Sequence, residues 1–302
     1  MPELPEVQTI ISDLNKKIVG NTITDFWSDW PKTIKGESLA VFKKEIIGRK
    51  ILGARRIGKN IFIDLSGKKT LYIHLKMTGH LLVKSRANFQ FLISNFQSIS
   101  NDQISKSKKH DYFGNKVNQY IHHIWYLGKN KTLEFSDLRK FGKIVLDDTK
   151  KISELKEIKV LGMDAMSPEF TLEKFKEILE KRKNTPIGIV LMEQERISGI
   201  GNIYRSEILF EAGIFPFKKT GELSQVEIKR LHKAINKVLR RAIKLRGTSD
   251  SDYRDTAGAP GSFQKILKVY RRDGKKCKKC DTIILRKKMG QRSVFYCPVC
   301  QK

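Results

Sequence analysis

The stretch GIGNIYRSEILFEAGIFP, residues 199–216, is the most informative part of the sequence for the fold. GIGN predicts a tight turn, and IYRSEILFEA predicts a helix that starts directly after it. The preceding segment IGIVLMEQ (187–194) predicts a second helix. GIGNIY does not fit a dinucleotide-binding fingerprint, because Tyr204 stands at the third glycine position and a helix, not a strand, is expected before it. The expected unit is therefore two helices joined through a glycine turn.

Further helices are predicted on both sides of this unit. SPEFTLEKFKEIL (167–179) predicts a helix with Ser167 as N-cap and Pro168 at the first helical position. SQVE (224–227) has the pattern of a capping box and opens the longest predicted helix. A loop rich in Gly, Ser and Asp (248–263) follows it. The buried face of the longest helix is expected to carry Leu223, Ile228, Leu231, Ile235, Val238 and Leu239.

All four cysteines lie near the C-terminus, in CKKC (Cys277 and Cys280) and CPVC (Cys297 and Cys300). Residues 281–296 separate the pairs, which is the spacing of a tetrahedral zinc site with two thiolates on each of two turns. Disulfides are the alternative, but nothing in the sequence indicates secretion, and the cysteines of each pair are too close for easy bridging. We therefore expect one structural Zn²⁺ that stabilises a hairpin too small to bury its own core.

The first half predicts a helix followed by strands. Apolar residues at helical spacing begin at Val7 and end before Gly20. Short β-type runs with turn signals and no helices between them then predict an antiparallel sandwich or barrel. These runs are KILGARRI, NIFIDL, TLYIHL, HLLVK, IHHIWYL, TLEF and KIVL.

The domain division follows from these patterns. We expect a β-sandwich domain over 1–148, a helical domain over 149–262 and a zinc hairpin over 263–302. Residues 85–119 are rich in Ser, Asn, Gln and Lys without periodicity, which predicts a long surface insertion without regular structure. A charged linker near 147–158 is expected to close the first domain. The fold class is α+β with several domains.

The charge indicates a polyanionic partner. The chain of 302 residues has 60 Lys and Arg against 32 Asp and Glu, a formal net charge of +28. Nucleic acid explains such an excess better than an anionic membrane surface does. No apolar run reaches the roughly 18 residues that a membrane span needs, and the N-terminus is not a signal peptide. We expect a cytoplasmic protein.

The first residues, MPELPEV, suggest a nucleophile. A small residue such as Pro2 normally permits removal of the initiator methionine, which leaves a secondary amine. An α-amine has a pKa of roughly 7.7–8.0, against about 10.4 for lysine, so far more of it is unprotonated at neutral pH. Its attack on an aldehyde gives an iminium that acts as an electron sink. The alternative is an ordinary N-terminus, with Glu3 and Glu6 stabilising the start of the first helix through its dipole.

Six separated stretches resemble the bacterial formamidopyrimidine-DNA glycosylase family, whose members repair oxidised purines. They are PELPEV, HLKMTG (74–79), DLRKFG (137–142), the stretch 199–216, QRSVFYC (291–297) and the zinc spacing. The resemblance covers the chain apart from 85–119. It implies an N-terminal helix with a β-sandwich, a helix–two-turn–helix DNA-binding module and a C-terminal zinc-ribbon hairpin.

The resemblance implies roles at the N-terminus. Pro2 is similar to the family's nucleophile, which attacks C1′ of the damaged nucleotide and displaces the base. Glu3 corresponds to the acid that protonates the opening sugar, and the iminium then drives β- and δ-elimination. Glu6 would hold the helix terminus and bond the sugar or the nucleophile.

DNA contacts are implied in the same way. Met77, Arg139 and Phe141 match the residues that fill the space left when the damaged base is flipped out. Lys59 in RRIGKN resembles a lysine that contacts the phosphate beside the lesion. The remaining predicted contacts to phosphate or DNA are His122, Lys183, Asn202, Tyr204 and Arg292, the last of which is linked to the second elimination.

The chain also departs from the family pattern. Leu138 and Lys140 replace a proline and an arginine of DPRRFG, and Gly188 stands where a lysine commonly follows TPI. Either His122 or its neighbour His123 could take the family's histidine role. The loop 247–262, expected to cover the flipped base, matches in position and glycine content more than in sequence.

The predicted function is a monomeric, bifunctional DNA glycosylase and abasic-site lyase of base excision repair. It would excise oxidised purines (formamidopyrimidines and 8-oxoguanine) from double-stranded DNA without a redox or nucleotide cofactor. One alternative is the endonuclease VIII type, which prefers oxidised pyrimidines but usually opens PEGPE, so Leu4 argues against it. Another is a damaged-DNA binder without catalysis, which intact Pro2, Glu3 and Lys59 disfavour. A plain zinc-ribbon transcription factor would explain nothing before residue 265.

Overall fold

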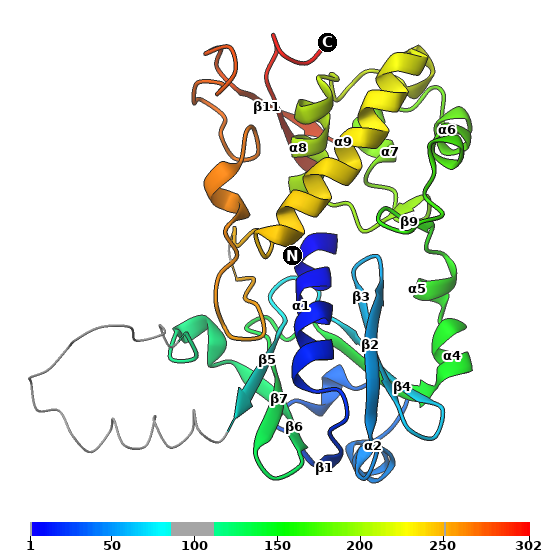
Figure 1. Cartoon of the computed structure of the whole chain (residues 1–302), viewed down its shortest axis with the longest axis vertical. Coiled ribbons are helices and arrows are strands. Elements are labelled where there is room, and N and C mark those ends of the chain that lie inside the picture. The colour runs from blue at the N-terminus through cyan, green and yellow to red at the C-terminus, as the bar shows by residue number, and fades with distance from the viewer. Residues whose placement is uncertain (1, 86–111, 251) are drawn as a thin grey trace, which may run out of the picture.

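The computed structural model describes residues 2–85, 112–250 and 252–302. A β-rich half and a helical half meet where the N-terminal helix begins, and the C-terminal hairpin lies beside the helical half (Figure 1). Most of the predicted insertion 85–119 falls outside the described residues. Its last part contains a short 3₁₀ turn at Lys116–Asn118.

The first helix, α1 (Leu4–Lys17), connects the two halves. Its spacing of apolar residues confirms the predicted helix, since Val7, Ile10 and Leu14 are buried in the core of the β-rich half. Leu4 instead packs into the core of the helical half. The start of α1 is therefore fixed between two cores.

Two four-stranded antiparallel sheets form the β-rich half, with strand orders β1-β6-β7-β5 and β2-β3-β4-β8. This confirms the predicted sandwich. The strand β1 and the helix α2 were not predicted. The elements are β1 (Ile23–Ser28), α2 (Leu39–Ile46), β2 (Ile51–Ile57), β3 (Asn60–Leu65), β4 (Lys69–His74), β5 (His80–Ser85), β6 (Ile121–Leu127), β7 (Lys131–Ser136) and β8 (Lys143–Asp148), with a 3₁₀ turn at Pro31–Thr33.

The predicted charged linker is wrong for most of its length. Two short helices, α4 (Thr149–Ser153) and α5 (Lys156–Lys159), follow β8 directly. Ile152 and Ile158 are buried against Phe62 and Tyr72 on the outer face of one sheet. Apolar burial thus outweighs the lysine-rich composition of the segment.

The helical half has one helix start that differs from the prediction. The helix α6 (Leu172–Glu180) begins after Thr171, whose side chain accepts a hydrogen bond from the Lys174 N–H. The predicted cap Ser167 lies in the turn before it. The next helix, α7 (Ile187–Val190), is shorter than predicted. A short parallel pair is formed by β9 (Met163–Asp164), which precedes α6, and β10 (Ile197–Ser198), which follows α7.

The helices α8 (Asn202–Ala212) and α9 (Gln225–Lys244) form the core of the helical half. The Ser224–Glu227 capping box of α9 is confirmed. The predicted zinc hairpin is also observed, with strands β11 (Leu285–Met289) and β12 (Arg292–Tyr296). Two more 3₁₀ turns are Thr220–Glu222 and Phe263–Ile266.

Candidate active site

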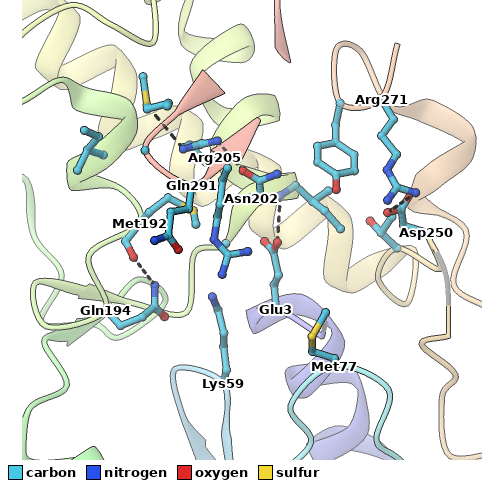
Figure 2. A pocket seen from close by; sticks show the side chains of 18 of the residues that line it. Glu3, Lys59, Met77, Met192, Gln194, Asn202, Arg205, Asp250, Arg271 and Gln291 are labelled. Carbon is cyan, nitrogen blue, oxygen red and sulfur yellow. Dashed lines mark hydrogen bonds and ion pairs between the residues drawn. The ribbon is translucent and has the colours of Figure 1, made fainter. Parts of the chain in front are cut away.

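A cleft of about 690 Å³ lies where the two halves and the hairpin meet. The β-rich half and the N-terminal segment contribute Glu3, Lys59 and Met77, and Figure 2 shows them facing Asn202 and Arg205 of α8. The cleft therefore brings together five residues predicted from sequence or resemblance to act in one site: Glu3, Lys59, Met77, Asn202 and Arg292.

The glycine turn before α8 permits this arrangement. A Cβ atom on Gly201 would lie 2.2 Å from Cδ of Glu3, and one on Gly199 would lie 2.4 Å from Cδ1 of Leu4. The Leu4 N–H also donates to the Gly199 carbonyl at 3.1 Å. Only glycine lets the two segments approach so closely, so the glycines of GIGN serve the packing of the N-terminus.

Glu3 is buried and accepts hydrogen bonds from the N-terminus of α8. Its carboxylate takes the N–H groups of Ile203 at 3.0 Å and Tyr204 at 3.3 Å. These are the unpaired donors at the positive end of the helix dipole, which favour a negative charge there. Pro2 precedes Glu3 directly and is also buried, while Met1 lies outside the described residues.

Glu6 lies directly behind Glu3. Its carboxylate accepts from the Glu3 N–H at 2.8 Å, the Thr248 N–H at 2.7 Å and the Tyr204 hydroxyl at 2.5 Å. Complete burial, and then the charge of Glu3, raise the pKa of Glu6 to about 7, although these hydrogen bonds oppose the shift. Glu6 can therefore hold or release a proton near neutral pH.

Tyr204 does not occupy the predicted phosphate-contacting place. Its side chain is fully buried, and its hydroxyl lies between Glu6 and Thr248, at 3.0 Å from the latter. The resemblance indicated a contact at the protein surface, whereas the structure makes this residue an internal support for Glu6.

Lys59 brings a buried amine to the cleft. It is only 8% exposed, and its Nζ donates to the Ile200 carbonyl at 3.0 Å. Burial lowers the pKa of Lys59, Glu3 opposes this shift, and the nearby positive charge of Arg292 reinforces it. An anion bound between the two cations would be held by both.

Met77, Arg139 and Phe141 form one cluster on two neighbouring loops. Phe141 is 53% exposed and Met77 44%, so neither is a core residue. The Arg139 guanidinium lies 4.7 Å from the Phe141 ring centre, and its Nη1 lies 3.0 Å from the Met77 sulfur. The three side chains thus present one apolar and cationic tip to solvent.

Polar contacts hold these two loops together. The Asp137 carboxylate accepts from the Thr78 hydroxyl and, at 2.8 Å, from the Gly142 N–H. The Arg139 N–H donates to the Thr78 hydroxyl at 3.1 Å. The loops are therefore fixed by a buried carboxylate, although the tip they carry is exposed.

The other predicted contacts lie elsewhere. Lys183 is exposed and pairs with Glu180, and it does not line the cleft. His122 is buried, and its Nδ1 lies 2.8 Å from the Asp29 carboxylate. His123 is fully buried among Phe26, Trp125 and Phe135. Neither histidine presents a free ring surface to solvent.

Several residues of the cleft were not predicted. Arg205 is 2% exposed, and Tyr253, Tyr270 and Gln194 also line the cleft. Arg205 could have been suspected from the sequence, because it directly follows Tyr204 in GIGNIYR, the stretch that predicted the glycine turn. The two tyrosines lie in the glycine-rich loop and the segment after it, where no periodicity marks a site.

The four cysteine sulfurs fit one zinc ion. They lie within 4.8 Å of one another, with Cys277 and Cys300 at 3.9 Å and Cys280 and Cys297 at 3.4 Å. These separations suit a tetrahedron with Zn–S bonds of about 2.3 Å. The Lys279 N–H points to the Cys277 sulfur at 3.4 Å, as expected for a thiolate ligand. All four cysteines are free of disulfides.

Comparisons with known proteins agree with this architecture. Three family models match: the formamidopyrimidine-DNA glycosylase N-terminal domain (1–144), its H2TH domain (161–253) and the zinc finger found in FPG and IleRS (274–302). Formamidopyrimidine-DNA glycosylase of Carboxydothermus hydrogenoformans is 38% identical over the whole of both chains. That of Pelotomaculum thermopropionicum is 37% identical, covering 100% of this chain and 99% of its own.

Solved structures give the same result. The complex of Lactococcus lactis Fpg with DNA containing an abasic site is 30% identical, with a TM-score of 0.80 and 99% of each chain covered. The complex of Lactococcus lactis Fpg with N7-benzyl-Fapy-dG DNA has the same identity and TM-score over 100% of each chain. Fold and cleft thus define a DNA glycosylase of the helix–two-turn–helix class that carries a zinc finger. The chain belongs to the formamidopyrimidine-DNA glycosylase family.

No helix in the described part of the chain is both long and apolar enough to cross a membrane.

Proposed function

We propose that this protein is a bifunctional DNA glycosylase and abasic-site lyase of base excision repair that removes oxidised purines. The observation that carries the proposal is the position of Glu3. Glu3 follows Pro2 directly in the chain, and its buried carboxylate lines the cleft. Lys59 and Arg292 line the same cleft. The relatives' names and the damaged DNA in the solved complexes favour the same reaction.

The reaction would start at Pro2 after removal of Met1. The secondary amine attacks C1′ of the damaged nucleotide, the bond between C1′ and the base breaks, and Glu3 protonates the sugar ring oxygen as the ring opens. The resulting iminium withdraws electrons from the sugar, so loss of a proton from C2′ expels the 3′ phosphate and loss of a proton from C4′ then expels the 5′ phosphate. Hydrolysis of the iminium finally releases the sugar remnant and restores the amine.

The surrounding residues would support three separate needs of this chemistry. Lys59 and Arg292 supply cations for the phosphates beside the lesion. Glu6 has a pKa near 7, so it can exchange a proton with the N-terminal amine or the sugar. The exposed tip of Met77, Arg139 and Phe141 suits insertion into the duplex where the base has left.

Zinc would act as a structural ion in this enzyme. Four thiolates fill its coordination sphere, so no position remains for a substrate or water. The ion stabilises the hairpin that carries Arg292. The cytoplasmic location and the monomeric state both belong to this proposal, as does double-stranded damaged DNA as the partner.

Oxidised purines are favoured over oxidised pyrimidines by the N-terminal segment. Leu4 is fully buried against Gly199, so a glycine here, as in the endonuclease VIII type, would leave a cavity in this chain. A silent DNA binder would not need a buried carboxylate and a buried lysine in one cleft, since both carry a desolvation cost.

Borohydride trapping on a panel of duplexes tests the proposal. Each duplex carries one lesion: a formamidopyrimidine, 8-oxoguanine, an oxidised pyrimidine or an abasic site. We expect a covalent adduct on the purine lesions and the abasic site, with peptide mapping placing it at Pro2. Preferred trapping on oxidised pyrimidines would establish the alternative substrate class. No adduct on any duplex would contradict the enzymatic function.

A further inference from the structure

Position 188 has no room for a side chain in this protein. A Cβ atom on Gly188 would lie 2.8 Å from the Met289 sulfur and 3.0 Å from the Pro216 carbonyl oxygen. The methionine could move, but the backbone carbonyl could shift only with its chain. Met289 of the zinc hairpin thus occupies the space next to the position where the family commonly has a lysine.

Arg205 places a cation beside this position. Its Nη1 donates to the Gly188 carbonyl at 3.3 Å and lies 3.6 Å from the Met289 sulfur. Its Nη2 donates to the Ser293 carbonyl at 2.9 Å and to the side-chain oxygen of Asn202. One guanidinium therefore joins α7, the start of α8 and strand β12.

The contact to Ser293 concerns the proposed chemistry directly. Ser293 follows Arg292 in the chain, and its carbonyl is the hairpin's acceptor for Arg205. This carbonyl belongs to the peptide group between Ser293 and Val294, so the bond ties strand β12 to Arg205 within one residue of Arg292. Figure 2 shows Arg205 beside Asn202, away from Lys59 across the cleft.

Burial of the Arg205 guanidinium lowers the stability of the fold, which suggests that the residue has a functional role. It is 2% exposed, and no carboxylate lies within ion-pair distance of it among residues 2–85, 112–250 and 252–302. The charge of Glu3 offsets part of this cost, but the groups in direct contact with the guanidinium are neutral. A buried charge without a direct ion pair is seldom the most stable choice, and an apolar side chain of similar volume would often be better for stability. Arginine can reach several acceptors at once because its donors form a rigid planar fork, which lysine lacks.

We propose that Arg205 is a positioning residue, which orients strand β12 so that Arg292 points into the cleft. This inference rests on the proposed glycosylase and lyase function. It assigns Arg205 to the second elimination through Arg292, and it gives Arg205 no contact with DNA.

Three variants of the full-length protein test this assignment: Arg205→Met, Arg205→Lys and Arg230→Met. Arg230 is exposed on α9, so its variant is a control with the same change of charge. Each variant is assayed in single turnover on an abasic-site duplex, with the ratio of δ- to β-elimination product as the readout. Zinc content and melting temperature are measured in parallel, so that a variant that fails to fold is recognised.

We expect Arg205→Met to retain zinc and to form the borohydride adduct, while its ratio of δ to β product falls about tenfold, as loss of a hydrogen-bonded charged group would predict. Arg205→Lys should fall nearly as far, because one ammonium cannot span the acceptors. Arg230→Met should match the wild type.

Two results would overturn the inference. A wild-type product ratio in Arg205→Met would show that Arg205 only fills space, and full rescue by Arg205→Lys would show that charge alone matters. If Arg205→Met loses zinc, the Arg205→Lys protein decides between positioning and charge. Failure of the wild type itself to trap or cleave would instead contradict the proposed function, which separates the two outcomes.

Discussion

Charged side chains are usually exposed and large apolar side chains are usually buried. The floor of the cleft departs from the first tendency, and the rim departs from the second. At the floor, Glu3 is 3% exposed, and Glu6 directly behind it is 1% exposed. At the rim, Met77 and Phe141 are 44% and 53% exposed. Charged groups thus lie inside, and large apolar groups lie outside.

Hydrogen bonds stabilise both unusual arrangements. Backbone N–H groups of α8 and of Thr248 satisfy the buried carboxylates, and the buried carboxylate of Asp137 holds the loops that carry the exposed apolar tip. Both arrangements cost stability compared with an ordinary surface and core. Such a cost indicates that each region is kept for its chemistry, and the predictions below test each region separately.

The largest effect is expected at the floor. Retaining Met1 should abolish borohydride trapping, because the amine is then no longer a secondary amine at Pro2. Pro2→Gly should slow base removal severely, and Glu3→Gln should slow it by about 10²–10⁴-fold, the usual contribution of a general acid. Single-turnover excision measures the two substitutions, and borohydride trapping measures the effect of Met1. An adduct on an internal lysine in the Met1-retaining protein would disprove the N-terminal assignment.

Removing the zinc site should have the next largest effect, because the zinc hairpin contributes Met289 and Arg292 to the cleft. Cys297→Ser should release the metal and weaken DNA binding, since the hairpin carrying Arg292 then loses its support. The β-rich half should stay folded because its core is separate from the one that contains Cys297. Elemental analysis should find one zinc per wild-type chain and less in the variant. If the wild-type protein contains no zinc, the proposed structural zinc site is wrong.

At the rim, Phe141→Ala should lower excision while leaving stability nearly unchanged. An exposed ring leaves no cavity, so the melting temperature should stay close to that of the wild type. Excision from a duplex should fall about tenfold, because the ring no longer replaces stacking that costs a few kcal/mol to lose. Cleavage at a preformed abasic site needs no base extrusion and should be spared.

Phe135→Ala is the matched control for the rim. Phe135 is 1% exposed in the β-rich core, and its loss should cost roughly 3–5 kcal/mol of stability through a cavity. If Phe141→Ala instead behaves like this control, with a large fall in melting temperature and equal loss of both activities, the exposed-tip interpretation is wrong.

Sequence alone predicted the parts that depend on local patterns. Short β-type runs with turn signals predicted the strands, the SQVE pattern predicted the Ser224–Glu227 cap, and the cysteine spacing predicted the zinc site. The structure contains all three. The resemblance added the family and the roles of five residues that line the cleft. The division at 148 and 262 remains a prediction.

The rest depends on contacts between distant segments. Nothing local shows that Tyr204 lies inside against Glu6, since the same motif would suit a surface contact. Arg205 reads as an ordinary surface charge on a helix until the hairpin is packed against it. Thr171 caps α6 while Ser167 accepts a hydrogen bond in the turn before it, and the pattern alone could not choose between them because both are good N-caps.

The last prediction concerns stability and not activity, and it compares Glu6 with an ordinary carboxylate. Burial raises the pKa of Glu6 from 4.5 to about 7, so the folded protein binds a proton more tightly than the unfolded chain does. The stability from this group is therefore fully present below pH 4.5, and it is lost as the pH rises through 7. Its total size is roughly 3 kcal/mol, at 1.36 kcal/mol per pKa unit.

Glu6→Gln should remove this dependence, because glutamine does not titrate. The free energy of unfolding of the variant minus that of the wild type should rise between pH 4.5 and 7 and become constant above pH 8. A changed hydrogen bond in the variant shifts the whole difference curve by a constant, so the slope and not the level is the readout. Denaturant unfolding at several pH values measures it. If the free energies of unfolding of variant and wild type run parallel with pH, Glu6 titrates like an ordinary carboxylate. The proposal that Glu6 exchanges a proton near neutral pH would then be wrong.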